Sequence, residues 1–307
     1  MEIILQIIIL ALGFALLIKG ADLFVDGTAS IAARFGIPQL IIGLTVVAMG
    51  TSAPEAAVSI SAAFDGNADI TIGNILGSNI LNILIILGIS AVITSIAVSK
   101  ATVRIDIPIM LASSVLLLLL GLDGQISRLD AVLIFACFIG FMVYMVFSAI
   151  KGNDSGDNIK VMSVPASLLF AVGGLLIIIV GSKLTVHGAT AIAKYAGLSE
   201  RFIGLTVAAF GTSLPELFTS VTGAKKGNTD MAIGNIVGSN IFNILFVVGL
   251  SGLAIPVPFD KSFMFDAYIT IASGVLLWLT CLKGRRLSRP AGIIFLVGYC
   301  IYFACII

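Results

Sequence analysis

The chain has 307 residues, of which 59% are hydrophobic and 11% are charged, and its formal net charge is +1. A soluble domain of this length needs far more charge to cover its surface, so the composition excludes an ordinary soluble protein. No basic run indicates a nucleic-acid partner, and the four cysteines lie inside apolar runs, where they are predicted to pack as small hydrophobic residues.

Uncharged apolar runs of membrane-spanning length recur along the chain, and they predict an all-α membrane protein with ten transmembrane helices. In chain order, these spans are expected near residues 3–30, 38–64, 71–97, 104–121, 129–150, 163–195, 200–224, 231–255, 264–283 and 290–306. The first run is not predicted to be a cleaved signal peptide, because Glu2 stands where such a peptide has a basic segment. A short polar linker, residues 151–160, falls at the midpoint.

The linker separates two predicted halves, residues 1–150 and 161–307, and the halves share an internal repeat. The repeat cores 42–90 and 203–251 align without a gap at an offset of 161 and match at 29 of 49 positions. Five spans per half is an odd number, so the halves are expected to have opposite orientations in the membrane. Inverted repeats with broken helices at the midplane are typical of secondary transporters, whose sites lie where the halves meet.

The distribution of Lys and Arg predicts which loops face the cytoplasm. Eleven basic residues fall in one set of alternate loops, which includes the central linker, and four fall in the other set. The positive-inside rule places the basic-rich set in the cytoplasm. Both termini of this cell-membrane protein are then expected outside the cell.

Each repeat core carries one carboxylate in the middle of an apolar span, Glu55 in GTSAPE and Glu216 in GTSLPE. A charge at the bilayer centre costs about 2.5–3.5 kcal/mol even on insertion scales, so an intramembrane carboxylate is a candidate functional residue. One such residue could simply be a protonated Glu bonded to a neighbouring helix. Two at equivalent places in the two halves favour a cation site.

Hydroxyl groups and a proline accompany each glutamate. Thr51 and Ser52 precede Glu55 by four and three residues, which puts them on the same helical face. Pro54 lacks an N–H group and its ring clashes with the carbonyl four residues earlier, so the helix should open and free main-chain carbonyls in residues 48–51. The second half repeats this pattern in Thr212, Ser213, Pro215 and Glu216. Freed carbonyls are expected there in residues 209–212.

The next predicted span of each half carries a polar stripe with a spacing of four residues. The members of the stripe are Asn74, Ser78 and Asn82 in the first half and Asn235, Ser239 and Asn243 in the second. These side chains either ligate a cation or hold the bundle together by interhelical hydrogen bonds. Asn79 and Asn240 point elsewhere on their helices and are predicted to be packing contacts.

The two cores together supply carboxylate, hydroxyl, amide and carbonyl oxygens, and they contain no His or Cys. Ligation by oxygen alone suits hard cations and disfavours Zn²⁺ and Cu⁺. Because Mg²⁺ sheds water reluctantly, a dehydrating cage favours Ca²⁺ and Na⁺.

Charged residues also stand at equivalent positions before each repeat core. His187 aligns with Asp26, and Lys183 aligns with Asp22. Two roles remain open for them. They make polar contacts near the membrane interface, or the two aspartates act in gating and cation entry.

The doubled motif G-T-S-x-P-E followed by G-N-x-x-G-S-N-x-x-N resembles the α-repeats of the sodium/calcium exchanger branch of the calcium/cation antiporter superfamily. It occupies Gly50–Glu55 with Gly73–Asn82, and Gly211–Glu216 with Gly234–Asn243. The resemblance implies four clustered cation sites, in which the two glutamates bind Ca²⁺ directly. It also implies that the first and sixth spans slide across the rest of the protein to alternate access.

The same resemblance implies neutral ligands around the glutamates. The carbonyls of Thr51 and Thr212 would assist Ca²⁺, and Asn82 and Asn243 would complete the middle of the site. The sodium ligands would be Ala48, Thr51, Ser52 and Ser78 in the first half and Ala209, Thr212, Ser213 and Ser239 in the second. Several relatives have Asp at one or both positions of Asn82 and Asn243, so their stoichiometry does not transfer to this chain, and potassium co-transport is less expected.

These features predict a secondary antiporter that exchanges Ca²⁺ for Na⁺ by alternating access. Its partners are the two ions as substrates and the lipid bilayer, and neither a cofactor nor a protein partner is expected. A Ca²⁺/H⁺ antiporter on the same fold is the main alternative, since two glutamates alone could carry protons, and a cation channel is a further one. An enzyme is not expected, because the repeat cores offer no usual nucleophile–base pair.

Overall fold

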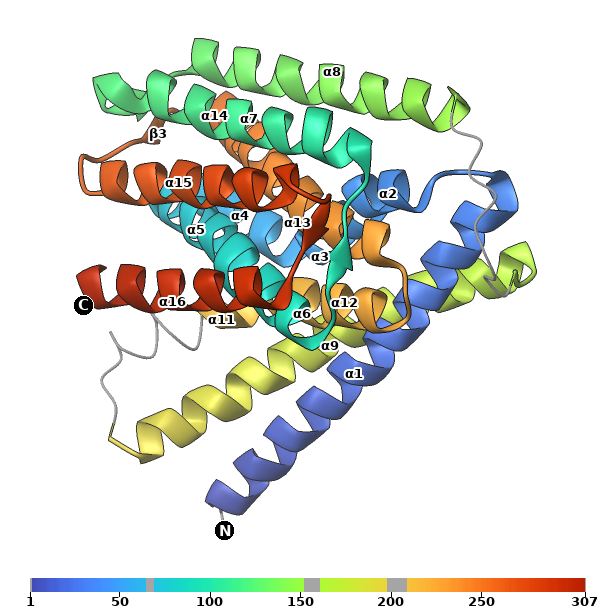
Figure 1. The fold of residues 1–307 in the computed structure, drawn as a ribbon. Coiled ribbons are helices and arrows are strands. Elements are labelled where there is room, and N and C mark those ends of the chain that lie inside the picture. The colour runs from blue at the N-terminus through green and yellow to red at the C-terminus, as the bar shows by residue number, and fades with distance from the viewer. Residues whose placement is uncertain (1, 65–68, 152–160, 198–208, 307) are drawn as a thin grey trace.

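The computed structural model describes residues 2–64, 69–151, 161–197 and 209–306, and the chain is almost entirely helical over these ranges. Eight of the described helices are long and apolar enough to cross a membrane, and one bent helix pair brings the number to nine. The protein is therefore a polytopic α-helical membrane protein. Figure 1 shows the two longest helices, α1 (Glu2–Phe35) and α9 (Val164–Tyr195), running obliquely past the others.

The predicted spans agree with the described helices to within a few residues, and one of them is broken. The span expected near residues 38–64 is a bent pair, whose two parts meet at 52°. Its parts in chain order are α2 (Gln39–Ile42), η1 (Gly43–Val47), α3 (Ala48–Thr51) and α4 (Ala53–Phe64).

One predicted span and the predicted linker are described only in part. The span expected near residues 200–224 is described from Ala209 onward, as α11 (Ala209–Thr212) and α12 (Leu214–Lys225). Its first residues, and residues 152–160 of the linker, lie outside the described part of the chain.

Two nearly continuous helical runs form the centre of the protein. The first consists of α5 (Asp69–Leu81), η2 (Asn82–Leu87) and α6 (Gly88–Ile93), and the second of α13 (Thr229–Phe242), η6 (Asn243–Val248) and α14 (Gly249–Ala254). In the most apolar 18-residue stretch of each run, 78% of the residues are buried in the first run and 83% in the second. The corresponding share in α1 is 17%. The hydrophobic core is therefore built around these two runs, and most side chains on them contact protein on every face.

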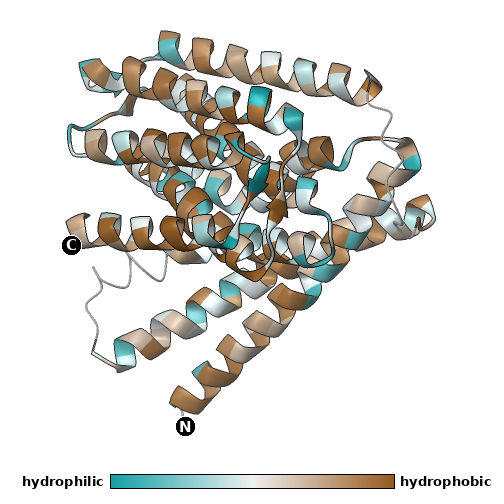
Figure 2. Cartoon of the chain, in the orientation of Figure 1, coloured by the Kyte–Doolittle hydropathy of each residue, from teal (hydrophilic) through white to brown (hydrophobic). Residues whose placement is uncertain are grey.

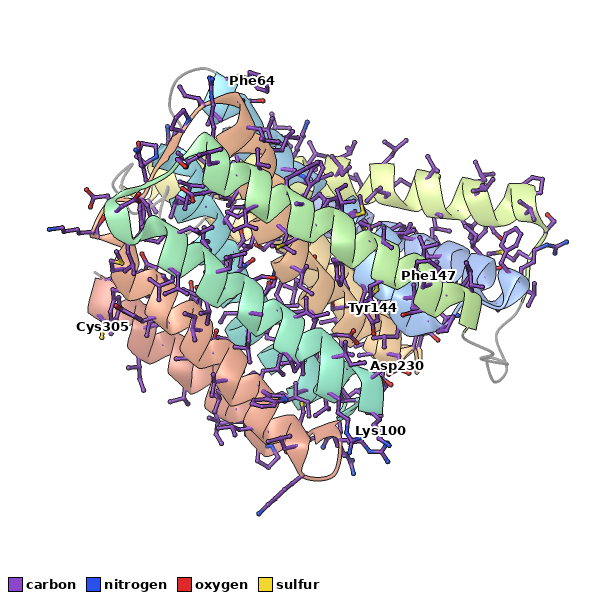
Figure 3. All side chains as sticks on the ribbon, turned by 90° about the horizontal axis from the view of Figure 1, so that it is seen from above. Phe64, Lys100, Tyr144, Phe147, Asp230 and Cys305 are labelled. Atoms are coloured by element: carbon purple, nitrogen blue, oxygen red, sulfur yellow. The ribbon has the colours of Figure 1, made fainter. Side chains whose placement is uncertain are left out.

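The outer helices present apolar side chains to their surroundings. They are η3 (Thr102–Asp106) with α7 (Ile107–Leu120) and η4 (Gly121–Asp123), α8 (Arg128–Lys151), α15 (Phe263–Leu282) and α16 (Arg289–Ile306). Figure 2 shows apolar residues over much of α1, α8 and α16. Exposed side chains on α8, such as Leu129 and the Phe147 labelled in Figure 3, are unfavourable in water and suit contact with lipid.

Two short strand pairs connect loops from the two halves of the chain. β1 (Ile96–Ala97) pairs antiparallel with β4 (Arg286–Leu287), and β2 (Gln125–Ile126) pairs antiparallel with β3 (Val257–Pro258). The repeat offset of 161 relates β1 to β3 and β2 to β4. Each strand therefore pairs with a strand of the other half, and the two pairings are reciprocal.

The helices α1 and α9 contact each other through their backbones. Glycines recur every seven residues on both helices, at Gly13, Gly20 and Gly27 on α1 and at Gly174, Gly181 and Gly188 on α9. A Cβ added at Gly20 would lie 2.8 Å from the backbone nitrogen of Ile178 and 2.9 Å from the carbonyl oxygen of Gly174. The absence of side chains at these positions is what lets the two helices approach so closely.

Candidate cation site

Both repeat cores break their helix two residues before the proline. Ser52 separates α3 from α4 with ψ of 7°, and Ser213 separates α11 from α12 with ψ of 3°. A proline follows two residues later in each case, and its missing N–H group prevents a continuous helical hydrogen-bond ladder. The predicted break is therefore confirmed, and it places Glu55 and Glu216 in the first turn of a new helix.

The carbonyls near the breaks are only partly free, which corrects the sequence-based expectation. The Ala48 carbonyl accepts the N–H of Ser52 at 3.0 Å and lies 3.5 Å from the Ser239 hydroxyl. The Gly211 carbonyl, which loses its helical partner to Pro215, accepts the Ser182 hydroxyl at 2.7 Å. Side-chain hydroxyls thus satisfy part of the backbone that the prolines expose.

Both glutamates are buried, and each is bonded to the serine of the other half. Glu55 and Glu216 are each only 1% exposed. The Ser52 hydroxyl donates to Glu216 Oε1 at 2.7 Å, and the Ser213 hydroxyl donates to Glu55 Oε1 at 3.3 Å. These reciprocal bonds bring the two motifs, 161 residues apart in sequence, into one site.

Asn82 and Asn243 begin the π-helical turns η2 and η6 of the two central runs. The Asn82 side-chain amide donates to Asn240 Oδ1 at 2.9 Å, and the Asn243 amide donates to Asn79 Oδ1 at 3.1 Å. Each π turn widens the helix at the asparagine, a distortion that is frequent at functional sites.

Four buried side-chain oxygens at the site accept no hydrogen bond from any described residue. They are Glu55 Oε2, Glu216 Oε2, Asn82 Oδ1 and Asn243 Oδ1. A buried polar atom without a partner costs free energy, so native proteins rarely leave one unpaired. Four acceptors of this kind, two of them on carboxylates, match the requirements of a cation and not those of an anion or a hydrogen-bond acceptor.

Further polar residues tie each glutamate-bearing helix to the centre. The Asn74 amide donates to the Ser59 hydroxyl at 2.9 Å, and the Asn235 amide donates to the Ser220 hydroxyl at 2.9 Å. The Thr51 hydroxyl lies 3.1 Å from Asn235 Oδ1. Of the two roles that the sequence left open for Asn74 and Asn235, these contacts show interhelical hydrogen bonding.

The remaining predicted site residues lie on the same short segments. Ser78 is 4% exposed and lies one helical turn before Asn82, and Ser239 is fully buried one turn before Asn243. Thr212 ends α11, and Ala209 begins it. The structure thus brings the predicted set to the two breaks and the two central runs.

Sequence reasoning missed three contributors to this region. Asn79 and Asn240 were expected to be packing contacts, but they bond directly to Asn243 and Asn82. Ser182 on α9 was not expected at the site. The sequence did carry a signal for the two asparagines, because the repeat has Asn at both equivalent positions, 79 and 240. It carried none for Ser182, whose equivalent position in the first half is Ala21.

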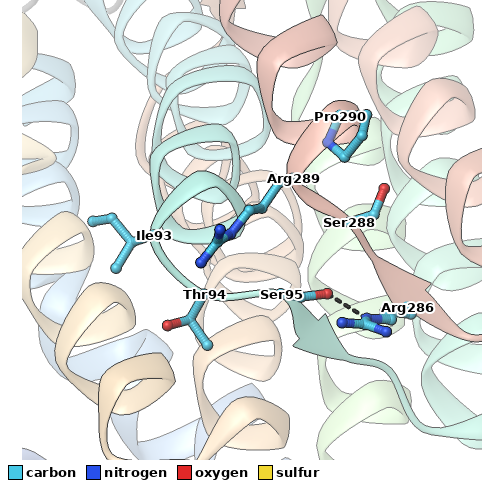
Figure 4. Close-up of a pocket in the computed structure, with 7 residues that line it drawn as sticks. All are labelled: Ile93, Thr94, Ser95, Arg286, Ser288, Arg289 and Pro290. Carbon is cyan, nitrogen blue, oxygen red and sulfur yellow. Dashed lines mark hydrogen bonds between the residues drawn. The ribbon is translucent and has the colours of Figure 1, made fainter.

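A hollow of about 650 Å³, whose lining does not include the glutamates, lies between the end of α6 and the start of α16. Figure 4 shows its lining, in which the Arg286 guanidinium donates to the Ser95 hydroxyl and Arg289 lies nearby. None of the seven lining residues is acidic. With two arginines and no carboxylate in its lining, this hollow does not suit a divalent cation.

Comparison with known proteins places the chain in a family. The family described as sodium/calcium exchanger protein matches residues 5–147 and 166–307. The CaxA protein of Alkalimonas amylolytica is 40% identical over 306 residues, and the sodium/calcium exchanger MaX1 of Methanosarcina acetivorans is 31% identical over 334 residues, with 95% of each chain covered in both cases.

A solved structure extends the similarity to the whole fold. The sodium-calcium exchanger NCX_Mj, soaked with zero Na⁺ and Ca²⁺, matches with a TM-score of 0.87 and 35% sequence identity. The match covers 99% of this chain and 100% of that chain. The family match spans both repeats, and its members are transporters and not enzymes. The chain therefore belongs to the sodium/calcium exchanger family of membrane antiporters.

Proposed function

We propose that this antiporter exchanges Ca²⁺ for Na⁺ at the site between the two glutamates. The observation that carries the proposal is the set of four buried, unpaired oxygens on Glu55, Glu216, Asn82 and Asn243. Carboxylate and amide oxygens are ligands that Ca²⁺ prefers in proteins. The two carboxylates, when ionised, match the two charges of the ion.

Neutral oxygens around the glutamates support Na⁺ as the counter-ion. Hydroxyl and carbonyl oxygens do not titrate in the working range, so they add nothing to proton transport, but they ligate a partly dehydrated Na⁺. Ser52 and Ser213 contact the carboxylates, and Ser239 lies near the Ala48 carbonyl. The remaining proposed sodium ligands are Thr51, Ser78, Ala209 and Thr212. Na⁺ bound beside Glu55 and Glu216 would share their oxygens with Ca²⁺, and sharing makes the two ions compete.

The names of two similar proteins support the same ions. MaX1 is named a sodium/calcium exchanger, and NCX_Mj is described as a sodium-calcium exchanger whose structures were solved with Na⁺, Ca²⁺ or Sr²⁺. Their identity to this chain, between 31% and 36%, extends over nearly its whole length.

We infer the ten-helix, inverted arrangement for the whole chain, with halves at 1–150 and 161–307 joined by the linker 151–160. Pairs of contacts that are equivalent under the repeat offset of 161 residues support this arrangement: Ser52 bonds Glu216, and Ser213 bonds Glu55. The two strand pairs are equivalent in the same way. A pseudo-two-fold axis between the halves produces such reciprocal contacts. The first half would contribute Glu55 and Asn82 to the site, and the second half Glu216 and Asn243.

A Ca²⁺/H⁺ antiporter on the same fold remains the second candidate. One observation favours it, since each glutamate keeps one carboxylate oxygen without a partner, and that oxygen could also hold a proton. Proton coupling would need only the two glutamates, whereas the neutral oxygens around them would then have no role beyond capping the broken helices.

The experiment is Ca²⁺ uptake into liposomes that contain the purified protein. Vesicles are loaded with Na⁺, diluted into ⁴⁵Ca²⁺, and treated with a protonophore that removes any pH gradient. Uptake is expected to persist with the protonophore and to stop when choline replaces the internal Na⁺. Uptake that needs a pH gradient and ignores Na⁺ would establish proton coupling instead, and flux that does not saturate would indicate a channel.

A further inference from the structure

Two buried asparagines outside the proposed ligand set bond to each other across the centre of the protein. The Asn79 amide on α5 donates to the backbone carbonyl of Asn240 at 3.3 Å, and the Asn240 amide on α13 donates to the backbone carbonyl of Asn79 at 3.2 Å. Neither is more than 1% exposed. The donor groups of both side chains are therefore held by the opposite backbone.

This exchange turns the side-chain oxygens of Asn79 and Asn240 toward the proposed ligands. Asn240 Oδ1 accepts the amide of Asn82, and Asn79 Oδ1 accepts the amide of Asn243. An asparagine side chain has a donor end and an acceptor end. With the donor ends engaged in this way, the unpaired ends of Asn82 and Asn243 are both oxygens.

We propose that Asn79 and Asn240 are positioning residues that fix the amide orientation of Asn82 and Asn243, so that oxygen and not NH₂ faces the cation. The proposal rests on the proposed function, which places a cation among those oxygens. A reversed amide would direct N–H donors at the cation and remove a ligand. Asn79 and Asn240 thus act through their neighbours and do not touch the ion.

The test is a double-mutant cycle on Ca²⁺ uptake that combines Asn79→Leu with Asn243→Asp. Leucine has a similar size but cannot accept the Asn243 amide, so KM for Ca²⁺ is expected to rise by roughly tenfold, the range of one lost buried hydrogen bond. In the Asn243→Asp background, both ends of the side chain are oxygens and orientation no longer matters. The same Asn79→Leu change is then expected to leave KM unchanged or to lower it, because the Asp carboxylate has no donor for Asn79 Oδ1.

The outcomes separate positioning from folding and from the proposed function itself. Ser90→Ala, at a buried hydroxyl that no described residue hydrogen-bonds, is the control and should leave KM unchanged. An equal effect of Asn79→Leu in both backgrounds, or no effect in either, would overturn the positioning role. If Glu55→Gln also kept normal uptake, the proposed site itself would be wrong, and not only the role of Asn79.

An independent observation concerns an ion cluster between α1 and the end of α12. Lys226 Nζ lies 2.7 Å from Asp26 Oδ1 and 3.3 Å from Asp22 Oδ1, and it donates to the backbone carbonyl of Asp22 at 3.1 Å. Asp22 and Asp26 are one turn apart on α1, and Lys226 follows the last residue of α12. Because α12 carries Glu216 in its first turn, the cluster connects α1 directly to a helix of the site.

A cavity of about 1110 Å³ lies at the opposite end of the α1–α9 pair. Its lining includes Pro54, Ser61, Ser182, Lys183, His187 and Thr212, so it reaches the residues next to Glu55 and Ser213. The glycine contacts show that the two helices run antiparallel. At the end with the ion cluster, Gly27 beside Asp26 faces Ser167 of α9. At the end with the cavity, Gly188 beside His187 faces Gln6 and Leu10 of α1.

The two ends of the α1–α9 pair therefore differ in the charge of their side chains and in what those side chains contact. At the repeat offset, Asp22 and Asp26 correspond to Lys183 and His187, which are exposed along the cavity. The position that corresponds to Lys226 is Asp65, which lies outside the described residues. One end holds α1 to α12 by the cluster, and the other leaves α9 beside an open cavity.

We infer that Lys226, Asp22 and Asp26 form a latch that holds α1 against α12 while the cavity at the other end is open. The close glycine contacts join α1 and α9, so a displacement of α1 from α12 also displaces α9, which lines the cavity. Breaking the latch should therefore shift the population away from the state with the open cavity.

The test measures access to the cavity directly, without transport. Ser61→Cys is introduced into a protein whose four native cysteines are replaced, and its rate of labelling by an impermeant maleimide is followed. Lys226→Ala is expected to slow labelling by about two- to fivefold, the range for an exposed ion cluster. Lys225→Ala is the matched control, because Lys225 is adjacent, exposed and without an ion-pair partner among the described residues.

A charge exchange completes the test. Lys226→Asp alone is expected to slow labelling further, because it puts three carboxylates together, and addition of Asp26→Lys is expected to restore the rate. Equal labelling rates in the Lys225→Ala and Lys226→Ala proteins, or no recovery in the exchanged protein, would refute the latch.

Discussion

The two carboxylates of the site share one pattern of contacts. Each is buried, and each receives a serine hydroxyl from the other half at one oxygen while the second oxygen is unpaired. Since a desolvated carboxylate is costly without a partner, the cation that we propose at this site would stabilise the charged form of both side chains.

The first prediction concerns the charge at this site. Glu55→Gln and Glu216→Gln each remove half of the formal negative charge, and loss of one partner from a buried charge interaction costs about 3–5 kcal/mol. Ca²⁺ uptake by each variant in liposomes should fall by at least roughly 100-fold. Asp123→Asn, at an exposed carboxylate, is the control, and near-normal uptake in either glutamine variant would refute the assignment.

The second prediction concerns the serines that bond across the halves. Ser52→Ala removes a 2.7 Å bond to Glu216, and Ser213→Ala removes a 3.3 Å bond to Glu55. A hydrogen bond to a charged group is worth about 1.5–3 kcal/mol, so the KM for Ca²⁺ should rise by tenfold or more, with the larger effect at Ser52. Ser114→Ala, which removes a hydroxyl bond within α7, should leave KM unchanged. The same change in all three variants would show that the effect is not specific to the site.

At the scale of elements, α1 and α9 are joined by contacts that only glycine permits. An added Cβ at Gly174 would lie 2.5 Å from the backbone nitrogen of Phe24, whereas one at the preceding residue, Gly173, would meet no atom within 4 Å. Two adjacent glycines on one helix thus differ completely in their surroundings. Separation of the two helices would break contacts along most of their length.

The third prediction follows from that difference. Gly174→Ala should separate the two helices and destabilise the protein by about 1–3 kcal/mol, as overpacking usually does. Gly173→Ala should be neutral or slightly stabilising, since alanine favours helix. Thermal unfolding of the detergent-solubilised proteins measures both, and equal melting temperatures would contradict the close contact.

At the scale of the whole molecule, the strand pairs connect loops that the positive-inside rule assigns to the same side. β1 and β4 belong to two basic-rich loops, and β2 and β3 belong to two loops of the other set. Figure 3 shows Lys100 and Asp230 at one end of the helices and Phe64 and Cys305 toward the other. Among the described loops, each strand pair joins two loops of the same set, while the basic count predicts which set faces the cytoplasm.

The fourth prediction tests this orientation by labelling in whole cells. The linker position Asp154 lies outside the described residues, so Lys100 represents its predicted side. In a cysteine-free background, Lys100→Cys should resist an impermeant maleimide until the membrane is permeabilised. Asp260→Cys should be labelled in intact cells, because Asp260 is exposed and lies in a loop of the set with few basic residues. The reverse pattern would invert the topology.

The sequence by itself determined the elements and the chemical character of the site. Span positions follow from apolar runs of sufficient length, and the break before Glu55 follows from Pro54, because both depend on local composition and backbone chemistry. The repeat identified Glu216 as the equivalent of Glu55 and gave the polar stripes around them. None of these inferences requires knowledge of how the helices pack.

Only the tertiary structure decided which residues are partners. That Ser52 bonds Glu216 and not Glu55, and that Ser182 satisfies Gly211, depends on helices far apart in sequence. Asn79 was misjudged for the same reason. A helical-face argument assumes one functional face, but most of the central run is buried. A side chain that points away from one partner can therefore point toward another, as Asn79 does.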